Sequence, residues 1–332
     1  MNSLKTAVQL TVALLAFCCA SNITAQTVDD APIKVNTVLL NVPVVVSDKD
    51  GRNITGLKKE DFSVYQEGVK QTIEFFANTE EPMNFAILID TSKSTIDALP
   101  YMRKAAKSFL GTIGPQDKGM VLSSDYEITT LSKLTSSVDK LRGGIDAATT
   151  TNMPSDQAPV PPGTLFDAIY RIINKDFAGE KGRKAIVILT DGFEIGKKIS
   201  AGDLITSLTE SDTIVYPIIF VSRGTISLLP KNLKTVTLDE ILNIPPANYM
   251  RDIANVTGGR VYSADTSDFS TAFQKIADEL KRQYVIGFYP TNAEGGKSAN
   301  ITIKVNRDGA VVRSKKTIRL KPRTPDGKKK DK

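Results

Sequence analysis

Two aspartates stand where apolar runs end, and their side chains are suited to binding a cation. Asp90 follows the apolar run 85–89, and Asp191 follows the apolar run 185–189. Both runs are short, continuous and rich in isoleucine or valine, which is typical of buried parallel strands. Because open α/β folds bind ligands at the carboxyl edge of the sheet, we expect both aspartates at that edge.

Hydroxyl side chains supply further oxygens near the same edge. Ser92 and Ser94 alternate with other residues after Asp90, so an irregular loop can aim all three side chains to one side. Thr164 directly precedes an amphipathic helical pattern and can present its hydroxyl at the start of that helix. If the strands that end at Asp90 and Asp191 are neighbours, all five side chains meet in one crevice.

A cluster of oxygens without nitrogen or sulfur favours a hard divalent cation. The expected ion is Mg²⁺, with Mn²⁺ or Ca²⁺ as alternatives. Two carboxylates balance its charge, while neutral hydroxyls leave it electrophilic and with open positions. Such an ion favours a carboxylate from outside, so the sequence predicts a non-enzymatic protein-binding or adhesion module that binds an exposed Asp or Glu of a partner.

Two other functions stay open. Asp90 could be the nucleophile of a phosphatase, but that chemistry needs a second aspartate two residues later, and Ser92 stands there. The chain has no histidine, and its two cysteines are Cys18 and Cys19, which leaves few groups for acid–base catalysis and excludes a Ser-His-Asp triad. The third reading is a degenerate, purely structural envelope protein.

The first 25 residues are typical of a secretion signal peptide. Lys5 precedes an uncharged, mostly apolar stretch, and small residues before Gln26 suit cleavage. We therefore expect a secreted or periplasmic protein; a lipid anchor on Cys18 or Cys19 is the alternative. No other apolar run approaches the length that crosses a membrane, so the mature chain is expected to lack a transmembrane segment.

The patterning predicts an α/β core between two β segments. Residues 26–80 read as strands and turns, residues 81–283 alternate strands with amphipathic helices as in a doubly wound, mostly parallel sheet, and residues 284–320 return to strands. Neither flank is large enough for its own core, so the two are expected to join into one β-sandwich. The net charge of +6 lies partly in the basic tail 321–332, which we expect to be solvated rather than to bind nucleic acid.

Several local expectations accompany this plan. The alternation through residues 35–46 predicts a half-buried strand, 72–76 a further strand, and 311–320 a single strand. Turns are predicted at 48–51 and 67–68, and a helix end at 258–259. Residues 223–247 read as an irregular excursion without an assigned role.

The constellation resembles the metal-ion-dependent adhesion site of von Willebrand factor A domains. In that family an Asp-x-Ser-x-Ser segment ends the first strand, a Thr precedes a central helix, and an Asp follows the fourth strand. The matching positions here are Asp90, Ser92, Ser94, Thr164 and Asp191. The resemblance implies that the first and fourth strands lie side by side, that the hydroxyls bind the ion directly, and that the aspartates act largely through water.

Flanking segments extend the resemblance, and one segment departs from it. The stretches 45–51, 57–62 and 284–290 are similar to exported, von Willebrand factor A-related proteins of the acidobacterial type. The pair 161–162 is Pro-Pro, where a second glycine is common before the Gly-Thr step, and this stiffer loop could shift Thr164.

Four further residues are expected in the surroundings of the crevice, in addition to a helix-stabilising aspartate. Asp167 is expected to stabilise the first turn of its helix through the dipole. Asp125 and Glu127 would belong to a rim or a solvated loop, and Phe193 and Glu194 would line the surface that faces the partner.

Overall fold

The structure is a computed structural model that describes residues 39–77, 81–150, 164–192, 198–221, 240, 248–264, 269–291 and 296–320. The chain divides into two compact units, Met1–Thr37 and Val38–Lys332, and all described residues belong to the second. The predicted signal peptide, the basic tail and all of the predicted excursion except Glu240 lie outside the described residues. Among those that are described, no helix combines the length and the apolar character needed to cross a membrane.

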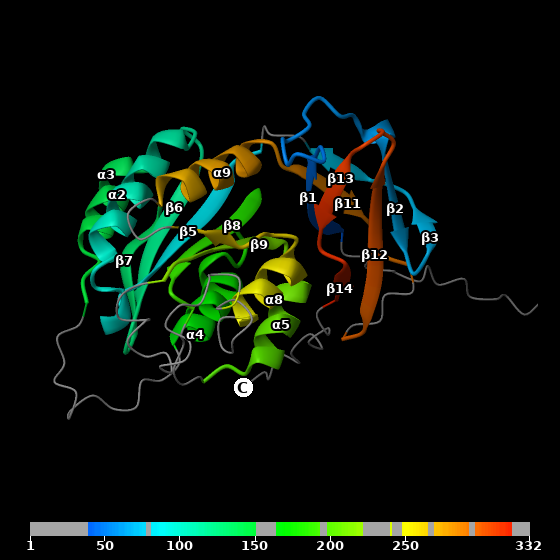
Figure 1. Cartoon of the computed structure of the whole chain (residues 1–332). Coiled ribbons are helices and arrows are strands. Elements are labelled where there is room, and N and C mark those ends of the chain that lie inside the picture. The colour runs from blue at the N-terminus through cyan, green and yellow to red at the C-terminus, as the bar shows by residue number, and fades with distance from the viewer. Residues whose placement is uncertain are drawn as a thin grey trace, which may run out of the picture. The chain divides into compact units, whose positions relative to one another are not determined.

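A six-stranded sheet forms the centre of the α/β part (Figure 1). Its neighbours are parallel, except that the last strand pairs antiparallel with the one beside it. The order across the sheet is β10 (Tyr262–Ser263), β9 (Thr213–Ile219), β8 (Arg183–Thr190), β5 (Met83–Asp90), β6 (Lys118–Ser124) and β7 (Ile128–Thr135). The expected mostly parallel, doubly wound fold class is therefore confirmed.

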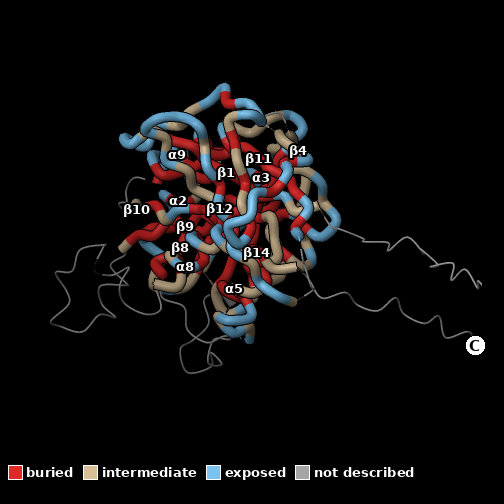
Figure 2. Tube along the Cα trace, turned by 90° about the vertical axis from the view of Figure 1, so that its right-hand side faces the viewer, coloured by how far each residue is buried: buried red, intermediate tan, exposed pale blue. Residues whose placement is uncertain are grey.

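Helices cover both faces of this sheet, because its strands are apolar on both sides. One face packs against α2 (Leu99–Phe109), α3 (Val138–Asp146) and α9 (Ser270–Lys281). The other face packs against α4 (Thr164–Arg171), α5 (Ala201–Glu210) and α8 (Asn248–Thr257). Every residue of β5 and β9 is buried, and β9 is drawn in red in Figure 2. Each large apolar side chain buried there contributes about 1.5–3 kcal/mol.

Strands from both ends of the chain form two antiparallel four-stranded sheets around a common core. One has the order β13 (Val311–Ser314), β1 (Leu40–Ser47), β11 (Tyr284–Phe288) and β4 (Phe75–Ala77). The other has the order β14 (Thr317–Arg319), β12 (Ser298–Val305), β2 (Phe62–Gln66) and β3 (Val69–Gln71). The flanking β-sandwich of N- and C-terminal strands is thus confirmed, while the domain boundaries at 80/81 and 283/284 stay a prediction.

Three of the predicted strands differ in the structure. β1 is buried from Val42 to Ser47 rather than half-buried, because it lies between β13 and β11 and also faces the core. The run 311–320 is broken into β13 and β14, which belong to different sheets. The strand predicted at 72–76 begins only at Phe75. The predicted turns are confirmed, since Gly51, Glu67 and Gly68 have φ of 81°, 47° and 79°.

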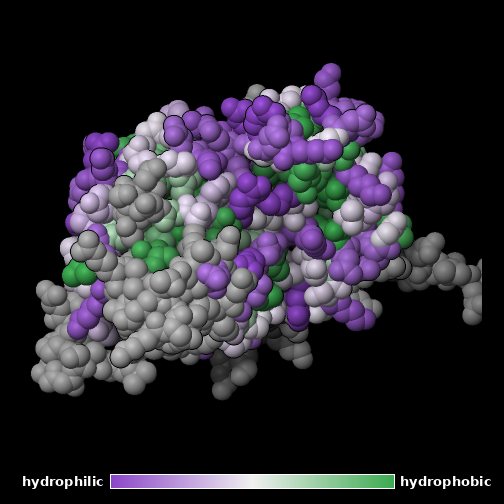
Figure 3. All heavy atoms as spheres, viewed as in Figure 1, coloured by the Kyte–Doolittle hydropathy of each residue, from purple (hydrophilic) through white to green (hydrophobic). Residues whose placement is uncertain are grey.

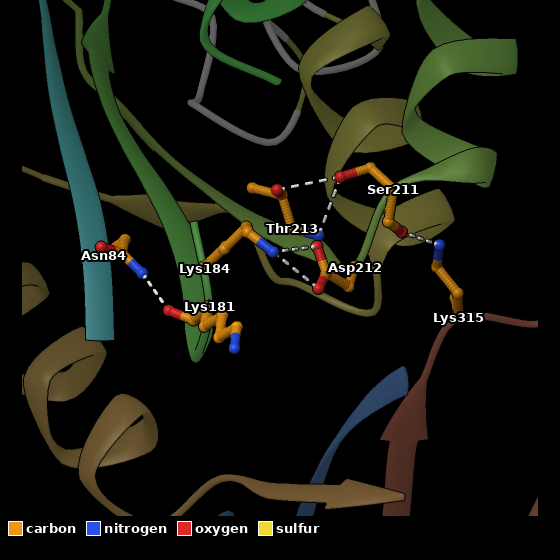
Figure 4. A network of polar contacts seen from close by, with 7 residues as sticks. All are labelled: Asn84, Lys181, Lys184, Ser211, Asp212, Thr213 and Lys315. Carbon is orange, nitrogen blue, oxygen red and sulfur yellow. Dashed lines mark hydrogen bonds and ion pairs between the residues drawn. The ribbon is translucent and has the colours of Figure 1, made fainter. Parts of the chain in front are cut away.

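Buried polar contacts join the sandwich to the α/β part. Lys315, which follows β13, directs its Nζ to the carbonyl oxygens of Leu208, Thr209 and Ser211 at the end of α5. Figure 4 shows its contact with Ser211 beside the Lys184–Asp212 ion pair. These charge-assisted hydrogen bonds satisfy carbonyls that have no partner within the helix.

Candidate functional site

Asp90 lies at the carboxyl end of β5, directly beside the end of β8. The two strands are parallel and Ile89 pairs with Leu189, which puts Asp90 opposite Thr190. Thr190 Oγ1 donates a hydrogen bond to Asp90 Oδ2 at 2.7 Å. Asp191 is the next residue after β8 and is completely buried. The two aspartates predicted to converge therefore follow neighbouring strands.

The loop after β5 is folded around the carboxylate of Asp90. The backbone N–H of Ser92 donates to Asp90 Oδ1 at 3.0 Å, and the Oγ atoms of Ser92 and Ser94 are 3.0 Å apart. Thr95 Oγ1 contacts the carbonyl oxygens of Asp90 and Ser92, both at 2.9 Å. These contacts hold the two serine hydroxyls on one side of the loop, close to Asp90.

Burial and like charge together give the site its electrostatic character. Asp90 is only 8% exposed. Burial, followed by the negative charge of Asp191, raises the pKa of Asp90 to about 7, although hydrogen bonds from Ser92 and Thr190 oppose the rise. None of these neighbours carries positive charge. A cation between the two carboxylates would lower the cost of keeping both of them ionised.

Thr190 and Thr95 position the site residues, and neither role was predicted from the sequence. Thr190 occupies the register position opposite Asp90, and Gly192 N–H donates to its Oγ1 at 3.0 Å. Thr95 continues the alternation of hydroxyl residues in the loop, but its side chain turns back onto the backbone. The role of Thr190 could have been predicted, because a hydroxyl residue ends the strand expected beside Asp90. The role of Thr95 could not, because nothing in the sequence pattern distinguishes it from Ser94.

Asp125 contacts the same loop from the end of β6. Thr91 Oγ1 and Asp125 Oδ2 are 3.3 Å apart, and Thr91 N–H donates to the carbonyl of Ser124 at 2.9 Å. Glu127 contacts Asp125 through its backbone, while its side chain is exposed. Asp125 is therefore in contact with the loop that carries the serines, while the rim role and the preferred solvated-loop interpretation both stay predictions.

Thr164 is the first residue of α4, and its side chain lies outside the described residues. Asp167, in the first turn of α4, accepts a hydrogen bond at 3.3 Å from the backbone N–H of Lys198. The start of α4 is thus beside the segment that connects β8 to α5. Asp167 has this tertiary contact in addition to the predicted helix-dipole role. Phe193 and Glu194 lie outside the described residues.

The donor set fits a hard, oxygen-preferring cation better than a softer cation that prefers nitrogen or sulfur. Oxygen atoms of Asp90, Ser92 and Ser94 lie within one loop, and the charge of Asp191 acts on Asp90. In the described part of the chain, no group of three or more His, Cys, Asp and Glu side chains could hold a metal. A cation here would depend on two carboxylates and on hydroxyls, which suits Mg²⁺, Mn²⁺ or Ca²⁺. The ligand roles of the five residues stay a prediction.

Comparison with solved structures finds von Willebrand factor A proteins. No family model and no curated protein matches the chain. Among solved structures, the vWF domain of the type V pili tip protein Mfa5 from Porphyromonas gingivalis matches with 13% identity and a TM-score of 0.40, covering 59% of this chain and 94% of its own. The von Willebrand factor type A protein from Catenulispora acidiphila matches with 10% identity and a TM-score of 0.44, covering 87% and 75%. Proximal thread matrix protein 1 from the mussel byssus, with a zinc-occupied MIDAS motif, matches with 16% identity and a TM-score of 0.46, covering 65% of this chain and 49% of its own.

All three TM-scores are below 0.5, so the fold is assigned from this chain's own strand order. In the central sheet, β5 is the first strand and β8 the fourth, and they are direct neighbours, as the resemblance implied. The chain is therefore similar in fold to von Willebrand factor A domains.

Proposed function

We propose that this chain is a non-enzymatic protein-binding module that uses a divalent cation to bind an acidic residue of a partner protein. Asp90, Ser92, Ser94, Thr164 and Asp191 would hold the cation, with Mg²⁺ preferred and Mn²⁺ or Ca²⁺ as alternatives. The observation that carries the proposal is the pair of buried aspartates at neighbouring strand ends, where burial and then the charge of Asp191 raise the pKa of Asp90. When bound, the cation would supply a positive centre for the partner's carboxylate.

The surface beside the loop supports a protein as the partner. Ile96, two residues after Ser94, is 58% exposed, and Tyr101 on the first turn of α2 is 46% exposed. Large exposed side chains of this kind contribute to protein interfaces when they surround a polar contact. A partner that places a carboxylate on the cation would also contact this apolar rim.

The proposed place of action is outside the cytoplasm. The signal-peptide pattern of residues 1–25 supports export to the periplasm, the cell envelope or the medium.

Calorimetric titration of Mg²⁺ tests the cation site. We expect saturable binding by the wild type and its loss in Asp90→Asn, which keeps the size and the hydrogen-bond acceptor of the side chain. The matched control is Asp97→Asn, because Asp97 is an exposed aspartate of the same segment. Equal Mg²⁺ affinity in wild type and Asp90→Asn would exclude the site.

Capture of partners from an envelope fraction tests the function. Proteins retained with Mg²⁺ and released by chelator should not be retained by Asp90→Asn. Retention of the same proteins by Asp90→Asn and in chelator would favour the purely structural alternative. Turnover of a phosphate ester that is lost in Asp90→Asn would favour the hydrolase alternative.

A further inference from the structure

A second, chemically different groove lies between the turn 48–53 and the outer face of α9. It has a volume of about 600 Å³ and is lined by side chains from that turn, from residues 260–263 and from α9. Hydrophilic residues cover the surface over α9 in Figure 3. None of the proposed cation ligands lines this groove, so it is separate from the site at the end of β5.

Charged side chains line most of the groove, and only some of them are paired. Arg52 forms ion pairs with Asp48 at 2.8 Å and with Asp50 at 2.5 Å. Glu279 is buried, accepts a hydrogen bond from Tyr262 at 2.6 Å, and forms an ion pair with Arg313. Arg313 thus balances the charge of Glu279, whereas Arg52 faces two carboxylates, which leaves one excess negative charge at the turn.

Three exposed basic residues of the groove have no such partner. Among the described residues, no carboxylate forms an ion pair with Arg260, Lys275 or Arg282. The acidic residue left in the groove is Asp278, which is also exposed and in no ion pair. With the excess carboxylate beside Arg52 and Asp278 both counted, the three unpaired basic residues exceed the uncompensated negative charges by one, and an anionic ligand would reduce the repulsion among the basic side chains.

The spacing along α9 indicates the form of the ligand. Lys275 lies in α9 and Arg282 is the C-cap residue of that helix, seven residues later, with Asp278 between them. At 1.5 Å per residue the two basic positions are about 10 Å apart. A single anion that contacted both side chains would lie against Asp278 between them and be repelled by it, whereas a peptide in the polyproline II conformation carries every third side chain on one face, about 9 Å apart.

We propose that this groove binds an extended acidic segment of a protein, with two carboxylates about 10 Å apart and a basic or hydrogen-bond-donating group between them. The carboxylates would contact Lys275 and Arg282, and Arg260 would add charge at the β10 side of the groove. The intermediate donor would meet Asp278. A uniform polyanion fits less well, because it places negative charge against Asp278.

Fluorescence anisotropy with a labelled peptide tests this proposal on the full chain. The probe carries two glutamates three residues apart and a lysine between them, and its control has glutamine in place of both glutamates. We expect saturable, salt-sensitive binding of the probe only. The double variant Lys275→Glu/Arg282→Glu should weaken binding about tenfold or more, since it reverses both charges.

Matched variants separate the groove from general charge effects and from the cation site. Lys281→Glu changes an exposed lysine of the same helix that does not line the groove, and it should bind within about twofold of the wild type. Asp90→Asn and added chelator should leave peptide binding unchanged, so failure of the proposed cation site would not affect this result. Circular dichroism confirms that each variant is folded.

Three results would overturn the proposal. One is equal affinity of wild type and double variant for the peptide. Another is an absence of saturation by the wild type at millimolar peptide. The third is tighter binding of inorganic polyphosphate than of the peptide with the same dependence on Lys275 and Arg282, which would identify a general polyanion groove instead.

Discussion

Replacing Lys315 with methionine should destabilise the protein strongly, although Lys315 is neither a proposed cation ligand nor a residue that lines the groove beside α9. Lys315 is 2% exposed, and its ammonium donates to Leu208 O at 3.2 Å, to Thr209 O at 3.0 Å and to Ser211 O. Methionine preserves the apolar stem but leaves these carbonyls at the end of α5 without their donor. Unsatisfied buried acceptors cost about 1–3 kcal/mol each, and the removed desolvation cost of the ammonium offsets part of that.

The expected net loss is about 2–4 kcal/mol in the free energy of unfolding. The chain has no tryptophan, so urea unfolding is best followed by circular dichroism. Lys316→Met is the matched control, because Lys316 is the next residue, is exposed and makes none of these contacts. It should change the free energy of unfolding by less than about 0.5 kcal/mol. Equal stabilities of Lys315→Met and Lys316→Met would refute the reasoning.

The same lysine predicts a pH dependence with a defined sign. Burial lowers the pKa of Lys315 from 10.5 to about 8, and Asp212 opposes the shift. The folded state therefore binds fewer protons than the unfolded state between pH 8 and 10.5. Lys315 thus lowers the free energy of unfolding by its full amount below pH 8, and this unfavourable contribution disappears as the pH rises to 10.5. The unfolding free energy of the wild type relative to Lys315→Met should increase over this range, by at most about 3 kcal/mol. A difference that is constant with pH would contradict the shift.

Two further substitutions test the site and the packing. Thr190→Val removes the hydroxyl that donates to Asp90, and it should weaken Mg²⁺ binding about tenfold in calorimetry without unfolding the protein; unchanged affinity would contradict a positioning role. Gly259→Ala would put a methyl group 2.0 Å from the carbonyl oxygen of Val215. Urea unfolding of this variant should show a free energy of unfolding about 2–3 kcal/mol below that of the wild type. Gly143→Ala is the control, since open space surrounds Gly143 in α3, and it should stabilise by about 0.5–1 kcal/mol. Similar effects of the two glycine substitutions would contradict the steric argument.

Local pattern was sufficient for the central elements of the fold. Continuous apolar runs predicted β5 and β8, because strands covered on both faces have no polar side to alternate. Amphipathic stripes predicted the helices that cover the sheet, and positive φ at Gly51 and Gly68 agrees with the predicted turns. The ends of the two runs also identified Asp90 and Asp191, since a carboxylate directly after a buried strand is visible in the sequence itself.

Tertiary structure decided what local pattern does not encode. The partners of a strand are chosen over long distances: β1 pairs with β11 and β13 and faces the sandwich core, so residues 42–47 are buried rather than half-buried. The break between β13 and β14 depends in the same way on which sheet each strand joins. Thr190 became part of the site only through the register of β5 and β8, which aligns backbone hydrogen bonds between segments 100 residues apart. The sequence by itself therefore determined which residues could bind a cation, while the pairing of distant strands determined which of them lie together.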